Sequence, residues 1–125
     1  MPDPEVIWHG ENNWELAKDY TLNGTTVPQG FRFDGASIPR PLWWWNQPAG
    51  IAFPAATIHD WLYKSHAIAR EESDLIFYTD LISTGVRPSV AYLMWFAARL
   101  FGGENWKRNM RNAWKVRQML DRRFA

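Results

Sequence analysis

Cysteine is absent from this chain of 125 residues, so it forms neither a disulfide nor a thiolate metal centre. Its absence fits a protein of the reducing cytosol, or of a particle assembled there. Residues 1–5 are acidic and hold no apolar segment, so we expect no secretion signal. The longest nearly apolar run, residues 90–101, contains Arg99 and is too short to span a bilayer. We therefore expect no transmembrane segment.

Several signatures of common enzymes are missing as well. The sequence has no glycine-rich phosphate loop, no dinucleotide-binding fingerprint and no zinc-binding pair. Ser37 lies in a turn-rich stretch, residues 34–41, without the strand-turn-helix glycine pattern of a nucleophilic serine. Nucleotide chemistry and serine catalysis are therefore not indicated.

Tryptophan, by contrast, is abundant. The chain has nine tryptophans, 46% apolar residues and 22% charged residues, which is typical of one globular domain with a substantial core. Three of the tryptophans, Trp43, Trp44 and Trp45, are consecutive, so an extended segment cannot turn all of them towards one core. They lock a loop onto the helices, contact a partner, or form a patch at a membrane interface.

Charge is distributed unevenly along the chain. The net charge is +1, but residues 107–123 carry seven basic residues against one acidic residue, Asp121, so this tail has a charge of +6 and the rest −5. One interpretation is the solvated face of an outer helix. Another is a surface for nucleic acid, anionic lipid or an acidic partner.

The order of local patterns predicts an α+β fold: a small N-terminal antiparallel sheet or hairpin followed by a C-terminal bundle of about four helices. Asn23-Gly24 predicts a hairpin between strands at 14–22 and 25–27. The helix at 89–101 is apolar almost all round and is therefore expected to be central. We predict one domain, residues 1–125, with a β-rich part at 1–35, an ordered loop rich in proline and tryptophan at 36–52, and a helical part at 53–125, its helices lying near 54–66, 71–83, 89–101 and 105–123.

The residues with the clearest chemical potential lie at the start of the helical part. His59 and Tyr63 are four apart and share a helix face, whereas Asp60 is rotated from His59 by about 100°. Asp74 lies on the next helix and can reach back to His59. This pattern suits His59 as a general base, Asp74 as the group that orients its ring, and Tyr63 as a donor to Asp74. Asp60, and with it Asp34, is then available for a hard cation.

Each of these residues also has a purely structural interpretation. His59 can be a buried histidine that Asp74 satisfies, so that it packs two helices together. Asp60 can pair with Arg70 or cap the loop at 34–37.

Two sequence blocks resemble a known family. Residues 30–39 (GFRFDGASIP) and 59–63 (HDWLY), with Arg70 and residues 74–77, are similar to small phage and prophage proteins described only as a domain of unknown function, DUF1353. The resemblance covers roughly residues 20–103. It implies a phage context, and hence a place in the host cytoplasm or in the virion.

The His-Asp-x-x-Tyr order, followed by a helix with Asp and then Phe, more distantly resembles prokaryotic and parvoviral phospholipases A2. That resemblance implies that His59 is the base, Asp60 a Ca²⁺ ligand, and Tyr63 and Asp74 the supporting network, with residues 33–36 in the place of the calcium loop. The glycine-rich loop and the flanking cysteines of most secreted members are missing here.

Two functions follow from these patterns. One is a hydrolase-like domain that cleaves a lipid ester or a similar acyl substrate, with an anionic lipid surface as partner. The other is a non-catalytic virion or tail protein whose polar cluster stabilises the fold and whose tryptophan and basic surfaces bind neighbouring subunits. Access to His59 separates them, because a base needs a substrate within reach.

Overall fold

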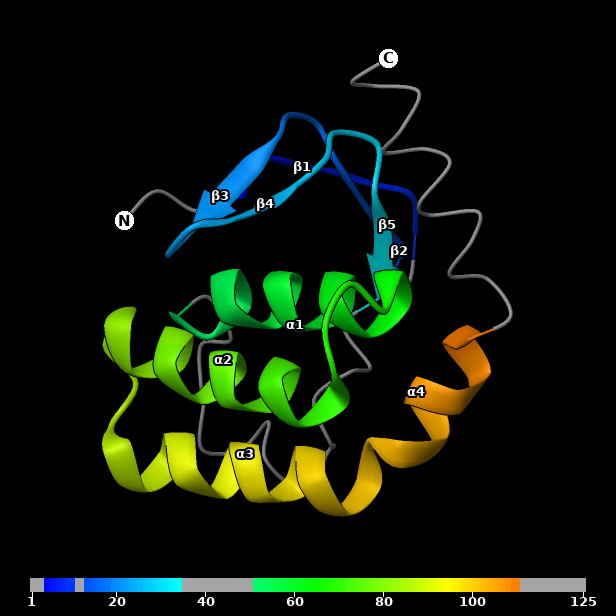
Figure 1. Ribbon diagram of the computed structural model, residues 1–125. Helices are drawn as coiled ribbons and strands as arrows, with labels where there is room; N and C mark the ends of the chain where they lie inside the picture. The colour runs from blue at the N-terminus through cyan, green and yellow to red at the C-terminus, as the bar shows by residue number, and fades with distance from the viewer. Residues whose placement is uncertain (1–3, 11–12, 35–50, 111–125) are drawn as a thin grey trace.

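The computed structural model describes residues 4–10, 13–34 and 51–110. Their element order confirms the α+β fold, with short strands followed by helices. Figure 1 shows the layers: the strands lie above α1, α2 lies below α1, and α3 lies below α2, while α4 turns away at the end of α3. The tryptophan triplet, Ser37 and the basic tail after residue 110 fall outside the described residues.

Antiparallel strands form two small sheets in place of the single sheet that the sequence suggested. In the first, β2 (Asn13–Leu16) pairs with β1 (Val6–Trp8) and β5 (Arg32–Asp34). In the second, β3 (Tyr20–Leu22) pairs with β4 (Thr25–Val27). The predicted strand at 14–22 is interrupted at residues 17–19, where Ala17 N donates to the Glu5 oxygen at 2.8 Å and the Asp19 side chain accepts a hydrogen bond from Gln29 N at 2.7 Å.

The predicted hairpin at Asn23-Gly24 is confirmed. Both residues have positive φ, 48° and 86°, as a two-residue type I′ turn requires. Asparagine and glycine are the residues that adopt this conformation at least cost.

Four helices follow the strands, the first three close to their predicted bounds, whereas the predicted end of the fourth falls outside the described residues. They are α1 (Phe53–Ser65), α2 (Arg70–Ser83), α3 (Pro88–Phe101) and α4 (Gly103–Met110). A proline lies in the first turn of both α1 and α3, where its missing N–H is not needed. His66, with φ 52°, ends α1 in the left-handed region. None of the described helices has the length and apolar character to cross a membrane.

The most deeply buried helix is α1, which separates two apolar clusters. Towards the strands, Ile58 and Trp61 pack with residues such as Leu16 and Phe31. Towards the other helices, Ala55 packs with a cluster that includes Phe77 and Met94. The prediction that the helix at 89–101 is central was therefore wrong. The central helix carries Thr57, His59, Asp60 and Ser65 among its buried residues, which made it look less apolar than an outer one.

A polar junction holds the hairpin against the end of α2. Asn23 donates to Asp80 Oδ1 at 2.8 Å and to Ser83 Oγ at 2.9 Å. Asp80 is 1% exposed, and its other carboxylate oxygen has no hydrogen-bond partner among the described residues. Burial therefore raises the pKa of Asp80 to about 6, against the opposing effect of the Asn23 hydrogen bond.

This junction makes stability depend on pH. Because the folded pKa lies above the ordinary value of 3.8, protonated Asp80 favours the folded chain at low pH, and that contribution is lost as the pH rises through about 6. Asp80→Asn removes the ionisable group and keeps an oxygen for Asn23. Relative to wild type, we expect the free energy of unfolding of the variant to rise by up to about 3 kcal/mol between pH 4 and pH 8. Urea unfolding of both proteins at the two pH values measures this difference, and an equal difference at both would contradict it.

Candidate functional site

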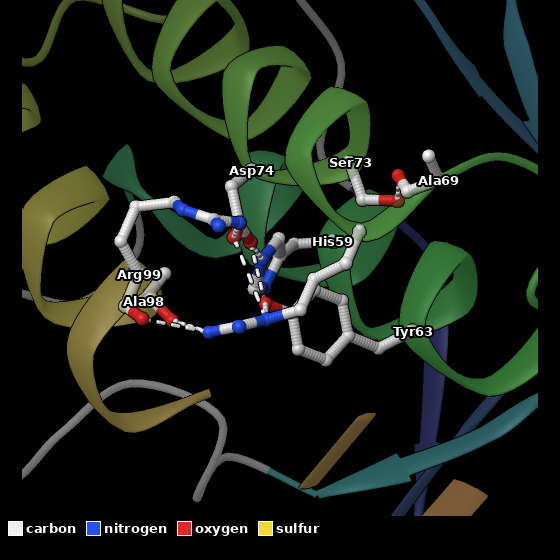
Figure 2. A network of polar contacts seen from close by, with 8 residues as sticks. His59, Tyr63, Ala69, Ser73, Asp74, Ala98 and Arg99 are labelled. Atoms are coloured by element: carbon white, nitrogen blue, oxygen red, sulfur yellow. Dashed lines mark hydrogen bonds and ion pairs between the residues drawn. The ribbon is translucent and has the colours of Figure 1, made fainter. Parts of the chain in front are cut away.

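The site is organised around the carboxylate of Asp74, which is 0% exposed. Its Oδ1 atom lies 2.7 Å from His59 Nε2 and accepts a hydrogen bond from the Tyr63 hydroxyl at 2.6 Å. Its Oδ2 atom accepts from Arg99 Nη1, also at 2.7 Å. Figure 2 shows these side chains converging from separate helices. The structure thus brings His59, Tyr63 and Asp74 together as the sequence predicted.

The helix geometry explains this convergence. His59 and Tyr63 lie one turn apart on α1 and point to the same side. The following helix, α2, packs against α1 and presents Asp74 in its second turn. The next helix, α3, packs against α2 and supplies Arg99 from its last turn. One carboxylate therefore joins three consecutive helices.

Sequence reasoning missed the part played by two arginines, Arg99 and Arg70. Arg70 Nε donates to the Tyr63 hydroxyl at 3.2 Å and lies 3.9 Å from Asp74 Oδ2. Arg70 Nη2 donates to the backbone oxygens of Ala98 and Arg99 at 2.9 and 2.8 Å. It therefore caps the C-terminal end of α3 and supports Tyr63 at once. The four-residue spacing of Arg70 and Asp74, and the need of a buried carboxylate for a cation, were the available signals.

The electrostatics of the cluster favour an ionised Asp74. Burial alone raises its pKa, but hydrogen bonds from His59, Tyr63 and Arg99 outweigh burial and hold the pKa below its ordinary value. Burial and the hydrogen bond to Asp74 raise the pKa of Tyr63, so its hydroxyl keeps its proton. Asp74 thus acts as acceptor, which places the proton of a neutral His59 ring on Nε2.

The His59 ring itself lies between two aromatic rings. Its centroid is 4.3 Å from that of Tyr63 and 4.4 Å from that of Phe77, the latter in a stacked arrangement. The residue is 4% exposed. None of the hydrogen bonds found among the described residues uses His59 Nδ1. The ring is therefore rigidly oriented, with one nitrogen bound to Asp74 and very little contact with solvent.

Asp60 points away from this cluster, as its rotation on α1 predicted. It is 2% exposed, and its Oδ2 atom lies 3.1 Å from Lys64 Nζ, one turn further along α1. Lys64 also donates to the backbone oxygen of Arg32 in β5 at 3.3 Å. The suggested pairing of Asp60 with Arg70 was wrong, because Arg70 turns to Tyr63 and the end of α3.

The described residues do not by themselves make a calcium site. Asp60 is engaged by Lys64, and no group of three acidic or histidine side chains gathers in the part of the chain that the structure describes. Asp34 ends β5, but its side chain falls outside the described ones. Calcium binding by Asp60 and Asp34 therefore stays a prediction.

The segment after α3 closes the site on one side. The indole of Trp106 on α4 stacks on the His66 ring at 3.8 Å and meets the Tyr63 ring edge-on at 5.2 Å. His66 Nε2 also lies 2.9 Å from the Trp106 backbone oxygen. These contacts hold α4 beside Tyr63, and they give His66 a structural role at the end of α1.

The molecule is thus a small α+β domain with a buried His-Asp-Tyr-Arg network at the junction of its helices. The profile of a family described as "Protein of unknown function (DUF1353)" matches residues 8–98. The chain belongs to this family, which confirms the resemblance to DUF1353, whereas the phage context stays a prediction. The matched region includes His59, Tyr63, Arg70 and Asp74, and it ends one residue before Arg99.

One curated protein is also similar to the chain. The "Uncharacterized protein y4jT" of Sinorhizobium fredii (strain NBRC 101917 / NGR234) is 30% identical over 96 residues, which are 71% of this chain and 29% of the relative. The chain thus spans less than a third of that protein's length. No solved structure matches the chain.

A substitution at Gly102 tests how closely the residues of the network are packed. A Cβ atom there would lie 2.7 Å from the Tyr63 hydroxyl and 2.5 Å from the Ala98 oxygen. At Gly103 the nearest atom would be Arg70 Nη1 at 3.5 Å, an ordinary contact. We expect Gly102→Ala to lower the free energy of unfolding by about 1–3 kcal/mol, and Gly103→Ala to change it by no more than about 1 kcal/mol. Denaturant unfolding compares the two, and equal effects would show that the Tyr63 side tolerates a methyl group.

Proposed function

We propose that this domain is a hydrolase of acyl esters in which His59 is the general base and Asp74 the group that orients it. The observation that carries the proposal is the 2.7 Å contact from His59 Nε2 to a carboxylate that Tyr63 and Arg99 also hold. A neutral imidazole with its proton fixed on Nε2 offers the Nδ1 lone pair to a water molecule. The similarity to phospholipases A2 in the His-Asp-x-x-Tyr order supports the same roles.

The reaction needs no covalent enzyme intermediate. Nδ1 of His59 takes a proton from water while the water oxygen adds to the ester carbonyl carbon. The tetrahedral intermediate then collapses, its bond to the alkoxide breaks, and the alkoxide receives the proton from Nδ1. The products are a carboxylic acid, which ionises in water, and an alcohol. Asp74 stabilises the imidazolium that forms between these steps, and Arg99 keeps Asp74 ionised throughout.

This scheme includes no step through a metal ion. The phospholipase resemblance implies calcium, but Asp60 is engaged by Lys64 at 3.1 Å. The proposal therefore rests on the His59–Asp74 pair alone.

A second candidate function is a non-catalytic phage protein of the virion or tail. The 4% exposure of His59 favours it, because a sealed histidine can serve only to join helices. In this case the only role of Asp74 is to join α1, α2 and α3. The partners are then other phage structural proteins. Both candidates place the protein in the host cytoplasm or in the particle, on the strength of the sequence resemblance to phage proteins.

Two substitutions of His59 separate the candidates. His59→Gln keeps a side-chain N–H for Asp74 but cannot act as a base at neutral pH, whereas His59→Ala loses both functions. If the proposal is right, each variant loses at least about 100-fold in the hydrolysis of a fluorogenic phospholipid ester. His9→Ala, a change to a histidine directly after β1 with a 33% exposed side chain, is the control and keeps full turnover.

Unfolding curves of the same proteins complete the test. Wild-type turnover that survives in His59→Gln would remove His59 from the mechanism. If wild type hydrolyses neither phospholipids nor simple esters, and His59→Ala is clearly less stable than His59→Gln, the second candidate is the correct one.

A further inference from the structure

The outer face of α3 exposes an unusual number of large apolar side chains. Five of its residues are at least 37% exposed: Tyr92, Leu93, Phe96, Leu100 and Phe101. The opposite face of the same helix is buried through Ala91, Met94, Ala97 and Ala98. Figure 1 shows α3 as the layer furthest from the strands. Exposed apolar residues are ordinary when scattered, but a contiguous group on one helix marks a binding surface.

The spacing makes this group contiguous. Tyr92, Phe96 and Leu100 follow one another at intervals of four residues and so form a single stripe along the helix. Leu93 flanks this stripe, and Phe101 lies at its end. The rings of Tyr92 and Phe96 lie nearly parallel, with centroids 6.4 Å apart. We call these five residues the α3 stripe.

The exposed charges at the two ends of α3 are mostly basic. The helix itself contains no acidic residue. Arg87 precedes it, and α4 adds Lys107 and Arg108 against Glu104, whereas Arg99 in the last turn of α3 faces inward to Asp74. An aromatic and aliphatic face with basic residues at its ends complements a layer of anionic headgroups above an acyl phase.

We propose that the α3 stripe is the surface by which this domain docks on an anionic phospholipid layer. The aromatic and leucine side chains enter the boundary between headgroups and acyl chains, and the basic residues at the ends of the helix contact the phosphates. A second copy of the chain is a poorer occupant, since a twofold pairing of this face would bring the same basic groups towards each other.

The α3 helix also connects the proposed docking surface to the candidate site. The helix that carries the α3 stripe supplies Arg99 to Asp74 and accepts Arg70 on its last carbonyls. An enzyme docked in this way would work on esters of aggregated, negatively charged lipid. The inference rests on the proposed function for this choice of substrate, whereas docking itself can be measured without catalysis.

Co-sedimentation with vesicles tests the proposal. Wild type should bind vesicles of phosphatidylglycerol and phosphatidylcholine, bind pure phosphatidylcholine much more weakly, and lose affinity as sodium chloride rises. The double variant Phe96→Ser/Leu100→Ser should weaken binding at least about tenfold. Ile7→Ser is the matched control, because Ile7 is 46% exposed, close to the 44% of Phe96, but lies on β1 at the opposite side of the molecule. It should bind as wild type does, and circular dichroism confirms that each variant is folded.

The other outcomes are equally clear. Absence of wild-type binding to the anionic vesicles, or equal binding by the double variant, overturns the proposal. So does a wild-type dimer that the double variant dissociates without any vesicle binding, because the α3 stripe would then be a subunit interface. His59→Gln distinguishes the two proposals: if it docks as wild type does, docking stands whatever the result for hydrolysis.

Discussion

A single buried carboxylate, that of Asp74, sets the arrangement of the helices. It has no access to water, so its charge is balanced by donors that α1 and α3 bring to it and by the guanidinium of Arg70 on its own helix. Loss of one partner of such a group costs about 3–5 kcal/mol. An apolar cluster of equal volume would be as stable or more so. Stability alone therefore does not require a charge at this position, and the network also holds the His59 imidazole in one orientation.

The sequence predicted the acidic and aromatic half of this network but not its cationic half. His59, Tyr63 and Asp74 are found by spacing, because four residues make one helical turn and the next helix returns antiparallel. Arg99 was considered only as a charge that interrupts an apolar run. Its partner lies 25 residues away, and no local pattern encodes that distance. Lys64 differs from Arg99, because it is the i+4 neighbour of Asp60 and this spacing is that of an ordinary helix ion pair, which the local sequence does encode.

The strand region shows the same division between local and long-range information. The Asn23-Gly24 turn was predictable because its two positive φ angles demand those residues. The split into two sheets was not, since it depends on which strands pair, β2 with β1 and β5, and β3 with β4. The order of burial among the helices also escaped prediction. Average hydrophobicity ranked α3 above α1, yet α1 is central because its polar residues find partners inside the protein.

The less apolar helix α1 is central and the more apolar helix α3 is exposed on one side. This arrangement connects the candidate site to the surface. The central helix α1 holds His59 through Asp74 of α2, and the buried Asp74 in turn requires a cation, which fixes Arg99 on the inner side of α3. Because only one side of α3 is buried, its remaining apolar side chains are exposed to water. A domain that needed only a stable core would gain from polar residues at Tyr92, Phe96 and Leu100. Their presence on a helix with basic flanks is therefore an argument for an apolar, anionic surface as the partner.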